Sequence, residues 1–207
     1  MPSTLSPLQN SILASVSHSP DAWRLTGGGA LAGYHLGHRT TEDLDLFLAG
    51  NGVFDEEPRA LVSQLVRDGF DVAIVQNAPG FKRYTVSKDQ DRVVVDLVAD
   101  SVDVIEPPTR RPPGVLVDTA QEILTNKLTT LLSRAEVRDL VDVAALVDAG
   151  EDLDRALDDA PRKDGGFSPM TLAWVLGQFP LHEAARHGYD EAALRAFRDH
   201  LVRLLTD

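Results

Sequence analysis

In the first half of the chain, some segments space their apolar residues with the period of a helix and others with the period of a strand. Ser6-Pro7 is typical of a helix start, because serine caps the first turn and proline fits its first position. Apolar spacing predicts helices that begin near residue 8, at 29–37 and at 58–69. Two-residue alternation predicts strands at 22–27, 43–49, 70–76, 81–88 and 92–99. The order α-β-α-β-α-β-β-β predicts a small mixed sheet with helices packed on it.

The pattern changes after a proline-rich segment at 106–114, and the rest of the chain is helical in period. Thr119 and Glu122 form the sequence signature of a capping box that opens the first of these helices. Four more helices are predicted at 137–150, 152–160, 168–179 and 190–205. We therefore expect an α/β (α+β) fold with an α/β lobe at 1–105, a proline-rich bridge at 106–114 and a helical lobe at 115–207.

Composition is that of an ordinary globular protein, with 43% hydrophobic and 25% charged residues in a chain of 207. The chain has no cysteine, which excludes disulfides and thiolate metal sites. The net charge of −12 argues against a broad nucleic-acid-binding surface. The N-terminal segment does not resemble a signal peptide, and no apolar run is long enough to cross a membrane. A cytoplasmic location without membrane contact is expected.

Two aspartates, Asp43 and Asp45, lie one residue apart in a predicted strand. Side chains two positions apart on a strand share a face, so the two carboxylates are expected side by side. Carboxylates in this arrangement suit a hard cation such as Mg²⁺. A solvated strand edge with an aspartate at each exposed position is the alternative interpretation.

A run of glycines, Gly27 to Gly29, lies between a predicted strand and a predicted helix. Backbone N–H groups at such a helix start bind phosphate oxygens, although a triple glycine is also common in plain tight turns. Asp96 interrupts the apolar run of another strand and is the candidate third carboxylate of the site; an exposed strand end would explain it equally well. Together these features match phosphoryl or nucleotidyl transfer.

The stretch "GGGALAGYHLGHRTTEDLDLF" resembles the first motifs of the AbiEii/AbiGii-type nucleotidyltransferases, a branch of the polymerase-β-like superfamily. The stretch "ILTNKLTTLLSRAEVRDLVDVAAL" is similar to the lysine helix and the Arg-Asp-x-x-Asp motif of the same family. Many members are toxins of toxin–antitoxin pairs, including a mycobacterial group that adds nucleotides to the tRNA 3′ end. The resemblance spans about residues 22 to 150.

The resemblance implies a role for each matching residue. Asp43 and Asp45 match the metal ligands, with one or two Mg²⁺ ions, while Gly28 and Gly29 match the phosphate-binding turn. In the second half of the family pattern, Lys127 matches the lysine that contacts the nucleotide triphosphate. Asp139 matches the essential aspartate of the last motif, and Arg138 and Asp142 flank Asp139. Two departures from the pattern concern phosphate contacts and the acceptor. The second glycine is serine in many members, and the tail after residue 150 is short and acidic.

Other positions near the site have two interpretations each. Arg39 either pairs with one of the aspartates or reaches a phosphate, and Thr41 either contacts the metal site or shapes the turn. Lys127 and Arg134 lie away from the leucine stripe of their predicted helix, so we expect a polar face there. As surface residues they would need no function.

The leading hypothesis is an Mg²⁺-dependent transfer of NMP from an NTP to an acceptor hydroxyl, with Asp96 or Asp139 assisting its deprotonation. The resemblance makes RNA, and tRNA above all, the expected acceptor, and implies a toxin with a cognate antitoxin. An adenylyltransferase that modifies a small molecule or a protein is the alternative, which the negative charge favours. The third hypothesis is a nucleotide-binding module without turnover.

Overall fold

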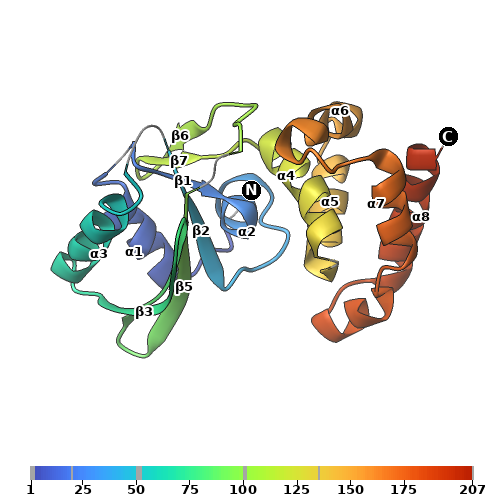
Figure 1. The fold of residues 1–207 in the computed structure, drawn as a ribbon. Helices are drawn as coiled ribbons and strands as arrows, with labels where there is room; N and C mark the ends of the chain where they lie inside the picture. Colours follow the sequence, from blue (N-terminus) through green and yellow to red (C-terminus); the bar gives the residue numbers. More distant parts are fainter. Residues whose placement is uncertain (1–2, 20, 50–52, 100–101, 135, 207) are drawn as a thin grey trace. The chain divides into compact units, whose positions relative to one another are not determined.

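The computed structural model describes residues 3–19, 21–49, 53–99, 102–134 and 136–206 (Figure 1). The chain forms two compact units. The first contains Met1–Ser101 and Pro107–Thr119, and the second contains Val102–Glu106 and Ala120–Asp207. A mixed sheet builds the first unit and helices build the second, so the predicted fold class is confirmed.

The sheet of the first unit has seven strands in the order β3-β4-β5-β2-β1-β7-β6. Two neighbouring pairs, β2 with β5 and β1 with β7, are parallel, and the other pairs are antiparallel. The strands are β1 (Trp23–Thr26), β2 (Asp43–Leu48), β3 (Asp71–Ala78), β4 (Phe81–Lys88), β5 (Asp91–Val98), β6 (Thr109–Arg111) and β7 (Val115–Val117).

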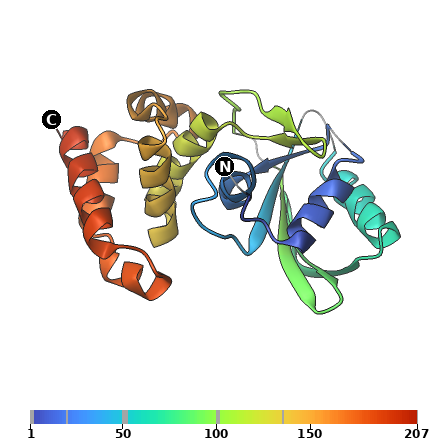
Figure 2. The same ribbon diagram turned by 180° about the vertical axis from the view of Figure 1, so that it is seen from behind.

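Helices α1 (Pro7–Val16) and α3 (Glu57–Arg67) pack on one another and on one face of the sheet (Figures 1 and 2). Helix α1 contacts β5, and the core-facing residues of β2 and β5 are almost completely buried: Leu44, Leu46, Val93, Val95 and Leu97. The Ser6 hydroxyl accepts a hydrogen bond from the Gln9 amide, and the Gln9 side chain accepts one from the Ser6 amide. The predicted helix start at Ser6-Pro7 is therefore present as a capping box.

The helix expected at 29–37 begins earlier than predicted. Helix α2 (Gly27–Ala30) follows β1 without a loop and continues as the π-helical turn η1 (Leu31–His35). The three glycines thus form the first turn of this helix rather than a separate turn before it.

The proline-rich segment does not behave as the expected bridge. Within 106–114 the chain enters strand β6, which pairs with β7 at the edge of the sheet. Proline lacks an N–H donor and is tolerated at sheet edges and hairpin ends, which is where this segment lies. Residues Val102–Glu106 instead belong to the second unit. The chain therefore passes between the units on both sides of this short segment and again at Ala120.

The second unit contains the helices α4 (Ala120–Ser133), α5 (Val137–Asp148), α6 (Leu153–Lys163), α7 (Pro169–Gly177) and α8 (Glu191–Thr206), with a 3₁₀ turn, η2 (Leu181–His187), that the sequence did not indicate. Helix α4 packs against α5, α6 and α7. Buried Glu122 of α4 pairs with Lys163 and accepts hydrogen bonds from the amides of Ile105 and Glu106. In the described part of the chain, no helix combines the length and apolarity that a membrane crossing requires.

Candidate active site

Gly27 lies where strand β1 meets helix α2, at a point too crowded for a side chain. Its φ is +58°, a conformation that residues with a Cβ atom rarely adopt. A Cβ atom here would lie 2.8 Å from the Oδ2 atom of Asp45. The register explains this proximity, because Thr26 at the end of β1 is the partner of Asp45 in β2. The first turn of α2 therefore begins beside the Asp45 carboxylate.

Gly28 faces polar side chains from the segment that leads into β2. A Cβ atom on Gly28 would lie 3.0 Å from the Thr41 hydroxyl oxygen and 3.1 Å from a guanidinium nitrogen of Arg39. The Thr41 hydroxyl also donates a hydrogen bond of 2.6 Å to Oδ1 of Asp43. A Cβ atom on Gly29 would meet core leucines of β1 and β2 at 3.1 and 3.2 Å, so this glycine permits close helix–sheet packing.

Three aspartates form a row on the sheet face opposite the core. Asp43 and Asp45 alternate along β2 with Leu44 and Leu46, which are 0% exposed. Asp96 of β5 is the register partner of Asp45, and partners on neighbouring strands point to the same face. The structure thus brings together the three carboxylates that the sequence analysis selected in this lobe.

Arg83 of β4 extends the row and was not identified from the sequence. It is the register partner of Asp96, and its Nε and a terminal nitrogen donate hydrogen bonds of 2.7 and 2.6 Å to the two carboxylate oxygens. The side chain of Arg83 is 42% exposed, whereas that of Asp96 is 7% exposed. The hydrogen bonds to Asp96, followed by the charges of Asp96, Asp43 and Asp45, raise the pKa of Arg83. Arg83 is therefore the counterion of Asp96 in this acidic row.

The donor chemistry of the row fits a magnesium ion that arrives with a nucleotide. Magnesium is commonly bound by one or two carboxylates together with substrate phosphates and water. Asp43 and Asp45 supply two such carboxylates, while Arg83 engages the third, that of Asp96. Within the described ranges, no three His, Asp or Glu side chains are grouped so as to hold a metal without further ligands.

Three of the remaining predicted residues, Lys127, Asp139 and Asp142, form a buried ionic cluster in the helical unit. The Nζ atom of Lys127 lies 2.6 Å from Oδ1 of Asp139 and 2.7 Å from Oδ2 of Asp142. Arg134 donates from Nε to the other oxygen of Asp139 at 3.0 Å. Both aspartate side chains are 0% exposed. The cluster joins α4 to α5 across their packed faces.

One expectation about this region needs revision. The expected polar face at Lys127 is wrong, because α4 is packed on several sides and the lysine side chain is only 8% exposed. Arg134 does lie nearer the surface, with 45% of its side chain exposed. Arg138 pairs with Glu136 at 2.6 Å, and 43% of its side chain is exposed.

Comparison with known proteins identifies the family. The family model described as nucleotidyl transferase AbiEii toxin, type IV TA system, matches residues 11–207. The crystal structure of JHP933 from Helicobacter pylori has a TM-score of 0.62 and 18% identity, with 98% of this chain and 93% of that chain covered. A structure described as a candidate nucleotidyltransferase from H. pylori has the same TM-score and identity, with coverage of 97% and 96%.

These solved structures share the fold of this chain at low sequence identity. A search of curated proteins gave no significant match. The family match covers nearly the whole chain, including both motifs whose geometry is described above. The chain therefore belongs to the AbiEii family and is a nucleotidyltransferase toxin of a type IV toxin–antitoxin system.

Proposed function

We propose that this enzyme transfers a nucleoside monophosphate from an NTP to the 3′-hydroxyl of an RNA, with tRNA as the leading acceptor. The observation that carries the proposal is the row of Asp43, Asp45 and Asp96 beside the first turn of α2. A helix start offers N–H groups that lack partners within the helix, and a carboxylate row offers cation ligands. Nucleotidyl transfer needs both in one place.

In the proposed reaction, the acceptor hydroxyl oxygen forms a bond to the α-phosphorus of the NTP. The bond from that phosphorus to the oxygen bridging to the β-phosphate breaks, and pyrophosphate leaves. Asp43 and Asp45 would hold Mg²⁺, which would neutralise charge on the phosphates as this exchange proceeds. In this proposal the backbone N–H groups of the first turn of α2 bind phosphate oxygens, together with Arg39 and Thr41, which lie beside Gly28.

The proton of the acceptor hydroxyl goes to Asp96 in this proposal rather than to Asp139. Both oxygens of Asp139 already accept hydrogen bonds from cations, and the side chain is fully buried. Asp96 also has a cationic partner, but Arg83 is 42% exposed and has room to release one of its two hydrogen bonds. Asp96 is in addition the direct neighbour of Asp45 across the parallel strand pair.

We propose a positioning role for Lys127, Asp139 and Asp142. A triphosphate contact by Lys127 would require its ammonium group to leave two buried carboxylates at 2.6 and 2.7 Å. Isolated buried charges are costly, so this exchange is unfavourable. The cluster is better suited to fixing α4 against α5. Arg138 has 43% of its side chain exposed, so in this proposal it is the residue of the motif that a nucleotide reaches more easily.

The experiment that tests the proposal is incubation of the protein with each of the four α-³²P-labelled NTPs and total tRNA, followed by separation of RNA and protein. Label in RNA that is lost in Asp45→Ala supports it. Label in protein or in a small molecule supports the alternative adenylyltransferase, which the net charge of −12 favours. Binding of NTP with no labelled product supports a module without turnover. An RNA acceptor would also place the enzyme and its antitoxin in the cytoplasm.

A further inference from the structure

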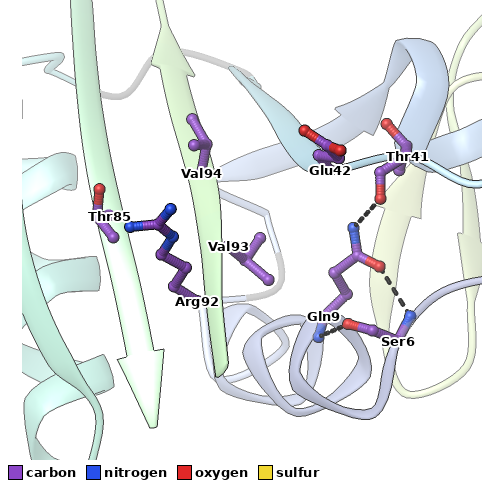
Figure 3. Close-up of a pocket in the computed structure, with 8 residues that line it drawn as sticks. All are labelled: Ser6, Gln9, Thr41, Glu42, Thr85, Arg92, Val93 and Val94. Atoms are coloured by element: carbon purple, nitrogen blue, oxygen red, sulfur yellow. Dashed lines mark hydrogen bonds between the residues drawn. The ribbon is translucent and has the colours of Figure 1, made fainter. Parts of the chain in front are cut away.

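A cavity of about 550 Å³ opens where the carboxylate row ends. Strand β2 begins at Asp43, whose partner in β5 is Val94. Strand β5 begins three residues earlier in this register, at Asp91, so its first residues extend beyond the start of β2. The space beside this extension is bounded by the start of α1 and by Thr41 and Glu42 (Figure 3).

Most residues that line the cavity have polar side chains, and hydrogen bonds hold some of them in place. The lining residues are Ser6, Gln9, Thr41, Glu42, Thr85, Arg92, Val93 and Val94. The Gln9 side chain donates a hydrogen bond of 3.0 Å to the Thr41 carbonyl, while the capping box holds Gln9 itself in place. Arg92 is exposed, and its guanidinium points toward Thr85 in the close-up (Figure 3). The cavity thus has one cationic wall and one anionic residue, Glu42, at its other side.

Thr41 connects the cavity to the reacting centre. It lines the cavity, its hydroxyl donates to Asp43, and the same hydroxyl lies beside Gly28. A ligand that contacts Thr41 from the cavity would therefore lie close to Asp43. Arg92 and Asp96 are four residues apart on β5. Side chains an even number of positions apart on a strand share a face, so Arg92 lies on the same sheet face as the carboxylate row.

We propose that this cavity binds the 3′-terminal nucleotide of the acceptor RNA strand, with Arg92 paired to its phosphate. This inference rests on the proposed function. An acceptor must present its hydroxyl at the carboxylates, and Thr41 connects the cavity to Asp43. Its volume is in the range of small-ligand sites. Only Val93 and Val94 are apolar, which does not supply the large apolar anchors on which peptide recognition relies.

The test compares charge variants on opposite sides of the cavity, with transfer of label from NTP to total tRNA as the readout. Arg92→Glu is expected to raise the apparent KM for tRNA about tenfold or more, because it removes one charge-assisted phosphate contact and adds repulsion. Glu42→Gln is expected to lower the same KM, because a negative charge near the phosphate is removed. The KM for NTP should change less than twofold in both. Arg59→Glu, on the exposed surface of α3, is the matched control and should change neither constant.

The outcomes separate this inference from the proposed function. If the unmodified protein labels no RNA, the proposed function fails and the acceptor site fails with it. If it labels RNA but Arg92→Glu leaves the KM for tRNA unchanged, only the acceptor site is overturned. An equal rise in the two KM values would place Arg92 at the NTP instead, and would also overturn it. Circular dichroism of each variant confirms that the fold is retained.

Discussion

Arg83 and Asp96 face each other across strands β4 and β5, joined by two hydrogen bonds of 2.7 and 2.6 Å. Asp96 is at the same time the neighbour of Asp45, so one guanidinium borders a row of three carboxylates. Like charges in a row disfavour ionisation of one another, and a fixed cation offsets this. The metal-free protein therefore carries a built-in counterion for its acidic site.

Replacing Arg83 should make the protein more dependent on magnesium for stability. Arg83→Ala is expected to cost about 1–3 kcal/mol, because the almost buried Asp96 loses a charged partner. Added Mg²⁺ should then raise the melting temperature of the variant more than that of the unmodified protein, since the ion takes over part of the charge neutralisation. Differential scanning fluorimetry with EDTA and with Mg²⁺ measures this. Arg83→Lys keeps the charge, so its rise in melting temperature with Mg²⁺ should lie between those of the unmodified protein and Arg83→Ala. An identical response to Mg²⁺ in all three proteins would contradict the counterion role.

Removing either strand aspartate should abolish transfer without unfolding the protein. Asp45→Ala relieves repulsion in the metal-free state, so its stability should equal or exceed that of the unmodified chain. Asp43→Ala also loses the hydrogen bond from Thr41, which lowers the expected gain by about 1 kcal/mol. Activity with labelled NTP and thermal melts of both variants check this. A large loss of stability in both would show that the pair is structural.

Much of the acidic row was predictable because strand alternation is a strong local signal. The apolar–acidic alternation of 43–49 placed Asp43 and Asp45 on one face, and an aspartate in an apolar strand marked Asp96. Arg83 was also accessible in principle. Strands β4 and β5 are joined by a tight turn at Asp89, which has a φ of +57°, and counting back from such a turn gives the pairing of Arg83 with Asp96.

Other features depend on tertiary packing that no local pattern reveals. Lys127 is spaced like a polar-face residue, but α4 contacts three other helices, so its polar positions are also covered. The segment 106–114 has the composition of a linker, yet it contains the edge strand β6, which forms by pairing with β7. The cavity beside Arg92 results from the offset between β2 and β5, which the sequence does not encode locally.

Gly27→Ala should damage the site and the fold together. The substitution forces a Cβ atom into a left-handed conformation at 2.8 Å from the Asp45 carboxylate, so we expect a loss of about 1–3 kcal/mol and of most activity. Urea unfolding and label transfer measure the two effects. Gly177→Ala is the control, since it lies at the end of α7 with nothing within 4 Å of its Cβ position. The control should be neutral or slightly stabilising. Equal effects at both positions would contradict the crowded, positive-φ role of Gly27.

Lys127→Met should destabilise the helical unit far more than it alters nucleotide use. The change leaves Asp139 and Asp142 buried without their shared ammonium group, and loss of one partner in a buried ionic cluster costs about 3–5 kcal/mol. Urea unfolding followed by circular dichroism measures the loss. The exposed Arg138→Ala should cost under about 1 kcal/mol.

A triple variant separates structure from catalysis at this position. Lys127→Met combined with Asp139→Asn and Asp142→Asn also removes the two buried negative charges that the ammonium group balanced, so part of the lost stability should return. If positioning is the role of the lysine, the KM for NTP in the remaining folded protein should stay within about threefold of the original, a difference under about 0.7 kcal/mol. The opposite result is equally clear. Lys127→Met with unchanged stability and a KM for NTP raised tenfold or more would mean that the ammonium group leaves its aspartates to bind the triphosphate.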